Sequence, residues 1–495
     1  MRHEAQSGFM ISNANVRNDI LIPRYYDPRI AQDISELTKT CDLVTIQKLV
    51  ENDCLEHRHG SYVPKIHYGT GAYPYIRTSD LANCEIKASP KHGVSHDVFI
   101  KFHAEQDVRR GDILFVHEGT YLIGSSALVT KYDGEILYQH HLAKFRVNSC
   151  APFDAFYFLA CINSEIVRRQ IRSKQFTADV IDSVVGRVGE VVIPIHKDTN
   201  RIKAVGAVVK KSIEGRAKAR EALSYSFTYY ESYLSGLSAK DVDHIREWEP
   251  EVFGANNDYT RFLGGRHGFK SYLKKNSGIV DNILIPKYYD PAISKRLQYF
   301  AGQCDLHSVG QLIDRGFLSL EAGDEIGKIS YGTGQISFVR TSDLGTYELL
   351  QDTKHNISDD ICDTYSAKQN VQAGDIFIVR DGTYLVGSSV IVSESDLPLL
   401  YCAGINKIRV KNGCTLDPYL IFALLNMPVV KDQIKSKQFT RDVIDTIGHR
   451  LKEVVLPIPK DATIRGKISS VTKWLYESRI QQRIDLSDAF VGLYG

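Results

Sequence analysis

The sequence predicts an α+β protein built from two similar domains and two long helices, and three observations support this prediction. First, Ile171–Asp182 (IRSKQFTADVID) recurs as Ile434–Asp445 (IKSKQFTRDVID), with ten of the twelve positions identical. Second, other segments match at one constant offset of 263 residues, the distance from Leu21 to Leu284. Third, a proline-free run with apolar residues at helical spacing follows each copy. Self-similarity over about 180 residues is typical of a domain-sized duplication.

The first half of each copy combines helix, turn and strand signals. ILIPRYYDP and ILIPKYYDP end in an Asp-Pro turn, and a helical stretch is expected over Ile30–Leu49. YGTG predicts a tight loop, and YIRTSDL predicts a strand that leads into a turn. A β-hairpin is expected from Ile113–Val116 through a Gly119 turn to Tyr121–Ile123, and Asp-Gly marks the same turn in the second copy.

The second half of each copy predicts two strands around a helix. AKFRVN and NKIRVK are expected strands, and a helix is expected to begin at Asp154 and at Asp417, where proline follows the second N-cap. SKQFT is expected to be a loop, and VVIPI or VVLPI a final strand. Each copy therefore predicts one α+β domain with a curved β-sheet.

The segments that follow the copies predict two long helices that pack on each other. Apolar stripes run through Ile202, Val205 and Val209 and through Ile468, Val471 and Leu475. We expect an antiparallel pair, with about 45 Å of contact for about 30 residues. The predicted boundaries are 1–198 for the first domain, 199–236 for the first helix, 237–282 for a connector, 283–461 for the second domain and 462–495 for the second helix.

Composition excludes some classes of protein. The 495 residues are 43% hydrophobic and 24% charged, with a net charge of +2, which is ordinary for a globular protein. The nine cysteines form no CxxC pair, so we expect reduced thiols and a cytoplasmic location. No signal segment or long apolar run is present, so membrane insertion is not expected.

Two similar domains joined through two similar helices predict a pseudo-two-fold particle. Such a particle suits a ligand that repeats along an axis. Duplex DNA is one such ligand, because half-sites one helical turn apart are separated by about 34 Å.

The chain also resembles a known family over almost its whole length. YPYIRTSDL (Tyr73–Leu81), GDILFVHEGTYLIGSS (Gly111–Ser126) and the segment from SKQFTADVID to VVIPI (Ser173–Ile195), each present twice, resemble the specificity (S) subunits of type I restriction–modification systems. The resemblance implies two target-recognition domains, each reading half of a split DNA site, separated by spacer helices. It also implies that the helices dock two methyltransferase subunits, which carry S-adenosylmethionine, and that a restriction or translocase subunit can join the complex.

Comparison of the copies sorts the candidate DNA contacts. Features that both copies share can serve the fold or sequence-independent phosphate contact, whereas features that differ can read bases. The alternative for the shared residues is a structural role, such as capping a turn. The shared candidates are Thr70, Arg77, Thr78, Ser79, Lys91, Thr120, Lys144, Lys174, Gln175 and Thr177, with their counterparts Thr333, Arg340, Thr341, Ser342, Lys354, Thr383, Lys407, Lys437, Gln438 and Thr440.

Two divergent residues are candidates for base reading. Gln335 replaces Ala72 and Arg380 replaces His117. Glutamine can bind adenine and arginine can bind guanine with paired hydrogen bonds. Arg380 is therefore the preferred guanine reader, and surface drift is the alternative for both positions.

No catalytic signature is recognised, so the chain is predicted not to be an enzyme and to hold no cofactor or metal of its own. GGRHGFKS lacks the spacing of a phosphate-binding loop, and Cys54, His57 and His59 have no counterparts in the second copy. Three alternatives stay open. The chain could be a DNA-recognition subunit of a related phage-defence system, a stand-alone DNA-binding regulator without a methyltransferase partner, or a nuclease with an unrecognised site.

Overall fold

The computed structural model describes residues 10–12, 16–17, 20–119, 121–178, 181–238, 240–247, 279–281, 283–382, 384–441 and 444–494. The side chains of 177, 178, 181 and 441 are also left aside. Two predicted DNA contacts, Thr120 and Thr383, and most of the expected connector 237–282 therefore lie outside the described residues.

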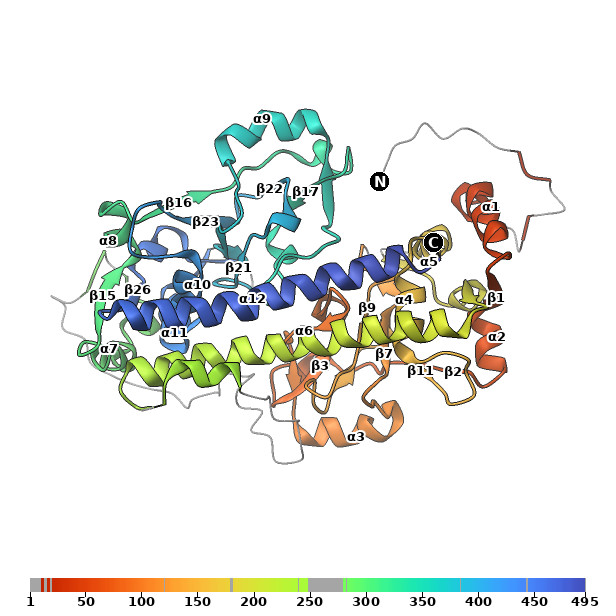
Figure 1. Ribbon diagram of the computed structural model, residues 1–495, viewed down its shortest axis with the longest axis horizontal. Coiled ribbons are helices and arrows are strands. Elements are labelled where there is room, and N and C mark those ends of the chain that lie inside the picture. The colour runs from red at the N-terminus through yellow and green to blue at the C-terminus, as the bar shows by residue number, and fades with distance from the viewer. Residues whose placement is uncertain are drawn as a thin grey trace. The chain divides into compact units, whose positions relative to one another are not determined.

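The chain divides into two compact units, each holding one copy of the repeat. The first-copy unit contains the described residues up to 218 and those from 481 onward. The second-copy unit contains the described residues between 219 and 480. Each unit thus combines one α+β domain with a part of each long helix, α6 (Thr199–Leu234) and α12 (Ala462–Val491) (Figure 1).

The first-copy unit mixes helices with small sheets. Besides part of α6, its helices are α1 (Pro28–Leu37), α2 (Ile46–Glu51), α3 (His96–Gln106), α4 (Ala155–Asn163) and α5 (Glu165–Ser173). Its strands are β1 (Cys41–Thr45), β2 (Leu55–His59), β3 (Tyr73–Ile76), β4 (Leu81–Ala82), β5 (Glu85–Ile86), β6 (Gly93–Val94), β7 (Ile113–Val116), β8 (Glu118–Gly119), β9 (Ser126–Leu128), β10 (Leu137–Tyr138), β11 (Leu142–Val147), β12 (Phe176–Ala178), β13 (Ile181–Ser183) and β14 (Val192–His196). The sheets have the orders β2-β11-β7-β9, β10-β3-β6, β12-β13-β8, β1-β14 and β4-β5.

The second-copy unit repeats this arrangement. Its helices are α7 (Pro291–Gln298), α8 (Val309–Asp314), α9 (Asp359–Gln369), α10 (Pro418–Asn426) and α11 (Pro428–Lys437), with part of α12. Its strands are β15 (Cys304–Ser308), β16 (Leu318–Ala322), β17 (Ile336–Val339), β18 (His355–Ile357), β19 (Ile376–Val379), β20 (Asp381–Gly382), β21 (Ser389–Ile391), β22 (Leu399–Tyr401), β23 (Ile405–Val410), β24 (Phe439–Arg441), β25 (Ile444–Thr446) and β26 (Val455–Pro459). The sheets have the orders β16-β23-β19-β21, β18-β17-β22, β20-β25-β24 and β15-β26.

The strand registers repeat with the sequence. Cys41 lies opposite His196 in the first copy, and Cys304 lies opposite Pro459 in the second, so both partners shift by the same offset. The predicted helix starts are confirmed, because α4 and α10 begin directly after Asp154 and Asp417. Each aspartate accepts hydrogen bonds from backbone N–H groups of the first turn, as an N-cap does.

Three predicted elements differ in the structure. The stretch Ile30–Leu49 is not one helix, because β1 interrupts it to pair with the distant β14. Tyr121–Ile123 is not the hairpin partner of β7, which pairs with β9 and β11 instead. SKQFT is not wholly loop, because β12 begins at Phe176 and pairs with β13. In each case pairing with another strand, and not the local sequence pattern alone, decides the conformation of a short segment.

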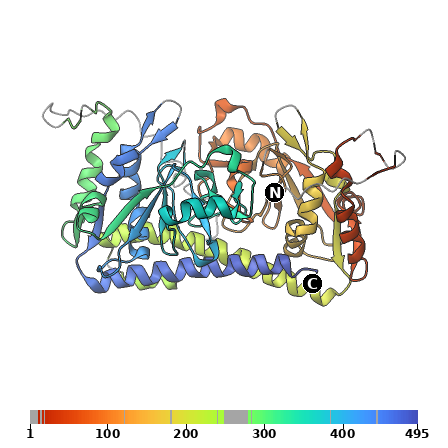
Figure 2. The ribbon, with the colours of Figure 1, turned by 90° about the horizontal axis from the view of Figure 1, so that it is seen from above.

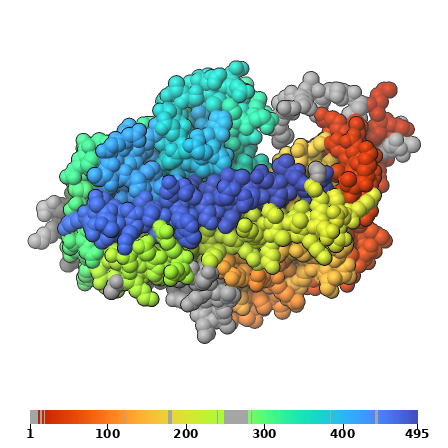
Figure 3. All heavy atoms as spheres, viewed as in Figure 1, coloured from red at the N-terminus to blue at the C-terminus, as the bar shows by residue number. Residues whose placement is uncertain are grey.

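The two long helices contact each other within each unit. In the first-copy unit, Arg201 of α6 donates a hydrogen bond to the Gly492 carbonyl, which directly follows α12, at 2.7 Å. In the second-copy unit, the hydroxyls of Tyr230 and Thr472 lie 3.2 Å apart. In both units the helix segments lie side by side (Figures 1 and 2). Both long helices are visible at the surface in the space-filling view (Figure 3).

A buried ion pair fixes each domain to the long helix that follows it. Arg216 of α6 lies 2.9 Å from Glu85, and Arg479 of α12 lies 3.1 Å from Glu348. All four side chains are at most 4% exposed. Because removal of one partner of such a pair leaves an uncompensated buried charge, the loss is typically about 3–5 kcal/mol. The pairs therefore hold equivalent domains on equivalent helix positions.

The part of the chain that the structure describes contains no helix with the length and apolarity needed to cross a membrane.

Candidate nucleic-acid interface

The first shared polar site, here called the arginine–tyrosine cluster, lies where β3 and β17 lead into short turns. It comprises Tyr68, Arg77, Lys91 and His92 in the first copy and Tyr331, Arg340, Lys354 and His355 in the second. The Arg77 guanidinium lies 5.8 Å from the centre of the Tyr68 ring, and that of Arg340 lies 5.9 Å from the Tyr331 ring. The histidine ring contacts the same tyrosine in each copy, with ring centres 4.5 Å and 4.1 Å apart.

A buried aspartate organises the turn at this cluster. Asp80 accepts hydrogen bonds from the backbone N–H groups of Arg77 and Lys91 at 2.9 Å and 3.2 Å. Asp343 does the same in the second copy, and both aspartates are fully buried. Burial raises the pKa of both carboxyls. The backbone of the shared RTSD segment therefore serves the fold, while the arginine side chain is half-buried and reaches the surface.

The electrostatic environment of the cluster is positive. Burial, and then the positive charges of the neighbouring arginine and lysine, lower the pKa of His92 and of His355 to about 4. Both rings are consequently neutral at pH 7. The Arg77 side chain is hydrogen-bonded to neutral groups, the Gln139 oxygen and the His92 ring, each at 3.2 Å. The cluster thus places a half-buried arginine and an exposed lysine beside one buried carboxyl, that of Asp80, and cations at a surface are the requirement for phosphate contact.

The remaining predicted contacts near this cluster are partly structural. The Thr70 hydroxyl donates to the His67 carbonyl at 2.7 Å and accepts from the Ser95 N–H at 3.1 Å, although the residue is exposed. Thr333 makes the equivalent two bonds in the second copy. The turn residues Thr78, Ser79, Thr341 and Ser342 are half-buried, and Lys91 and Lys354 are exposed.

The second shared polar site, here called the lysine–glutamate cluster, lies at the base of the hairpins β12-β13 and β24-β25. In each unit the hairpin projects on the side away from the long helices (Figure 2). Lys174 lies 3.1 Å from Glu190, and Lys437 lies 2.9 Å from Glu453. Each ammonium also lies over a tyrosine ring, that of Tyr25 or Tyr288. The positive charge of each lysine is therefore compensated by a glutamate within the protein.

The neighbouring glutamines and threonine are also engaged within the hairpins. The Gln175 amide donates to Asp182 at 2.5 Å, and the Gln438 amide donates to Asp445 at 2.8 Å. The Thr440 hydroxyl donates to the same Asp445. The side chain of Thr177, its counterpart, lies outside the described part of the structure.

Arg187 and Arg450 lie in the short segments that follow the same hairpins, and the sequence comparison missed them. Their guanidinium groups lie 4.0 Å from the rings of Phe176 and Phe439. Each also donates a hydrogen bond to the backbone carbonyl of Lys174 or Lys437. The constant offset of 263 residues could have identified this pair, because the arginine is shared although the residues around it differ.

Lys144 and Lys407 lie in the interior and do not reach the surface. They are 0% and 1% exposed. The Lys144 ammonium donates to the carbonyls of Gln106 and Asp107 at the end of α3, and Lys407 binds the equivalent carbonyls after α9. Burial lowers the pKa of Lys144. In each copy the lysine connects a helix C-terminus to a central strand. The C-terminus of a helix favours a cation. A lysine buried in this way cannot contact DNA.

At the divergent positions, the two copies have different side chains in equivalent places. Arg380 is paired with the adjacent Asp381 at 2.7 Å and is 29% exposed. At the equivalent position of the first copy, His117 is buried and lies 3.3 Å from His59. Gln335 is exposed beside the shared loop of the second copy. Both predicted base readers therefore stay predictions, and Arg380 would have to leave Asp381 to bind a base.

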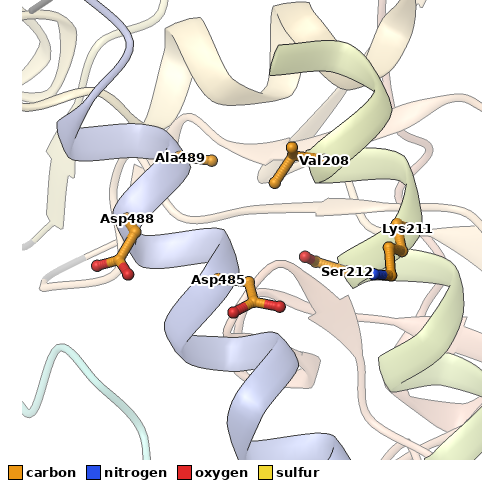
Figure 4. Close-up of a pocket in the computed structure, with 6 residues that line it drawn as sticks. All are labelled: Val208, Lys211, Ser212, Asp485, Asp488 and Ala489. Carbon is orange, nitrogen blue, oxygen red and sulfur yellow. The ribbon is translucent and has the colours of Figure 1, made fainter. Parts of the chain in front are cut away.

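The hollow between the long helices in the first-copy unit includes none of the predicted contacts. Its volume is about 380 Å³, and Figure 4 shows Asp485 directed into the gap between the helices. It is lined by Val208, Lys211, Ser212, Asp485, Asp488 and Ala489. Among the described residues, no group of three or more histidines, cysteines or carboxylates is placed to hold a metal ion.

No protein-family model and no curated protein matches the chain. Three of the solved structures that match come from type I restriction–modification systems. The S subunit from M. genitalium is 13% identical over 90% of this chain and 92% of its own, with a TM-score of 0.33. The HsdS subunit from Thermoanaerobacter tengcongensis is 14% identical over 92% and 95%, with a TM-score of 0.24. A chain from a study of complex assembly and conformational transition of the type I system is 13% identical over 92% and 96%, with a TM-score of 0.23.

Proposed function

We propose that this chain is a non-catalytic DNA sequence-specificity subunit of a type I restriction–modification system, and that it reads a split DNA site with one copy of the repeat on each half. The observation that carries this proposal is the arginine–tyrosine cluster. It occurs once in each unit, with the same cation over the same ring and the same neutral histidine beside it. A positive surface that is built twice suits a polyanion that repeats along its axis.

The long helices are proposed to act as spacers. In this proposal α6 and α12 pair antiparallel and relate the two domains by a pseudo-two-fold axis. The hydrogen bonds between helix segments inside each unit support the pairing. The helices would dock two methyltransferase subunits that carry S-adenosylmethionine, and a restriction or translocase subunit could join them.

The two copies of the repeat allow a direct test of the proposal with a chimera. In the chimera, residues 20–198 are replaced by the equivalent residues 283–461, so that both domains carry the second copy. The chain is co-expressed with a candidate type I methyltransferase subunit from the same genome, and methylated sites are mapped by single-molecule sequencing. Wild type should methylate an asymmetric split site. The chimera should methylate a site whose two halves are inverted copies of the second half.

Two results would overturn the proposal. One is a methylated site that does not change in the chimera, provided that the chimera still binds the methyltransferase. The other is DNA binding by the purified chain without any capture of a methyltransferase, which would favour a stand-alone DNA-binding regulator. Cleavage of DNA by the purified chain alone with a divalent metal would instead favour a nuclease.

A further inference from the structure

An exposed isoleucine occupies the same position in both copies. Ile66 is 80% exposed and Ile329 is 92% exposed. Each is the middle residue of a single 3-10 turn, Lys65–His67 or Lys328–Ser330. A lone exposed aliphatic side chain is ordinary on a protein surface. Here the Lys-Ile pair is kept in both copies while the residues on both sides of it differ, PKIH in one copy and GKIS in the other.

The loop that carries the isoleucine has the same backbone hydrogen bond in both copies. After the 3-10 turn, the N–H of Gly69 donates to the Gly93 carbonyl at 2.8 Å, and that of Gly332 donates to the Asn356 carbonyl at 2.7 Å. Both glycines have positive φ values, +71° and +77°. The doubly bonded hydroxyl of Thr70 or Thr333 follows directly.

A second glycine keeps each loop close to the domain. A Cβ atom on Gly71 would lie 2.5 Å from the Val94 carbonyl oxygen, and one on Gly334 would collide with that of Ile357. The exposed isoleucine therefore belongs to a loop whose close approach to the domain is the same in both copies.

The charge around the isoleucine fits a polyanion. Lys65 and Lys328, which directly precede it, are exposed in both copies. Tyr68 and Tyr331, two residues after it, are the rings over which Arg77 and Arg340 lie. The apolar side chain thus stands on the border of the arginine–tyrosine cluster.

We propose that Ile66 and Ile329 are wedges that enter a groove of duplex DNA and partly unstack a base step, one in each half-site. This inference rests on the proposed function, and it adds a mode of contact to it. Apolar side chains flanked by cations insert between base steps in proteins that kink DNA. Because the isoleucine is shared by copies that are expected to read different half-sites, a sequence-independent contact fits better than recognition of a thymine methyl group.

The test uses the full-length chain with its methyltransferase and the duplex identified by methylation mapping, with 2-aminopurine placed in turn along each half-site. The variants are Ile66→Ala, Ile329→Ala and the double variant. The matched control is Leu237→Ala, because Leu237 is also 80% exposed but has no counterpart in the other copy. Affinity is measured by fluorescence anisotropy, and folding is checked by thermal melting.

Each single alanine variant should weaken DNA binding about tenfold, as expected when an isoleucine side chain no longer buries its surface. Wild type should raise 2-aminopurine fluorescence at one step in each half-site. Each single variant should abolish the rise in one half only, and the double variant should abolish it in both. Ile66→Leu and Ile329→Leu should retain both effects, and Leu237→Ala should behave as wild type.

Several results would overturn the wedge. Unchanged affinity in the double variant would do so while leaving the proposed function intact. A loss of affinity in the alanine variants, with no rise in 2-aminopurine fluorescence in the wild-type complex, would do the same. Loss of methyltransferase capture with DNA binding retained would show that the isoleucines contact protein. Failure of the wild-type complex to bind any duplex would overturn the proposed function together with the wedge.

Discussion

The two shared polar clusters are equally well repeated, yet their charges are arranged differently. In the lysine–glutamate cluster, a carboxylate lies 3.1 Å or 2.9 Å from each ammonium. In the arginine–tyrosine cluster, the arginine also lies over a tyrosine ring, but the Arg77 side chain is hydrogen-bonded to the neutral groups Gln139 and His92. The carboxyl of Asp80 accepts backbone N–H groups there. Repetition within the chain therefore marks positions that matter, but only charge compensation separates a structural cation from one that can bind phosphate.

The largest expected effect comes from the arginines. The double variant Arg77→Met/Arg340→Met should lower affinity for duplex DNA by about 100-fold at 0.15 M salt, because each arginine loses a charge-assisted contact. The slope of log affinity against log salt should fall by about one for each arginine. Anisotropy titrations over a range of salt concentrations measure both quantities, with Lys174→Met/Lys437→Met as the charge-matched control. Equal losses in the two double variants would remove the distinction between the clusters.

A change at the divergent position should affect one base pair. Arg380→Ala is expected to relax discrimination at a single position of the half-site that the second copy reads, by about tenfold. The other half-site should keep its sequence, because His117 occupies the equivalent position there. Methylation mapping of the variant checks this prediction. Relaxation in both halves, or in neither, would show that Arg380 is not a base reader.

The histidine of the cluster reports the local potential. Arg77→Met should raise the pKa of His92 from about 4 toward its ordinary value of 6.5, because a positive charge beside the ring is removed. Titration of the ring by NMR measures this shift. Lys174→Met should leave it unchanged, and a shift of equal size there would contradict the comparison.

The lowered pKa of His92 also determines how the free energy of unfolding changes with pH. Between pH 4 and 6.5 the folded state binds fewer protons at His92 than the unfolded state does. The stability from neutral His92 is therefore fully present above pH 6.5 and is lost as the pH falls toward 4. In Arg77→Met this loss should be smaller, which urea unfolding at pH 7 and pH 5 can measure.

The smallest effect is expected from the lysines of the hairpins. Lys174→Met/Lys437→Met should change DNA affinity by no more than about twofold, since each ammonium is already neutralised by glutamate. Each substitution should instead lower the free energy of unfolding by about 1 kcal/mol or less, the usual range for a partly exposed ion pair. Anisotropy and urea denaturation measure the two quantities on the same preparation. A large loss of DNA binding without loss of stability would assign the lysines to the interface.

Several features could be predicted from residues and their spacing. The constant offset predicts two domains with the same register, because equal sequences bury the same residues in the same order. The N-caps at Asp154 and Asp417 and the strands β11 and β23 follow from local patterns. Thr70 and Lys144 show where such prediction ends. Both are shared polar residues, yet one hydroxyl closes a loop and one ammonium caps the distant end of α3.

The sequence by itself determined that the chain is a duplication, where α4 and α10 begin and which residues both copies keep. Only the tertiary structure decided which of those residues are buried, which are neutralised and which stand at the surface. The physical reason is that charge compensation and burial depend on partners far along the chain. Glu190 for Lys174, the end of α3 for Lys144 and the ring of Tyr68 for Arg77 are brought together only by folding.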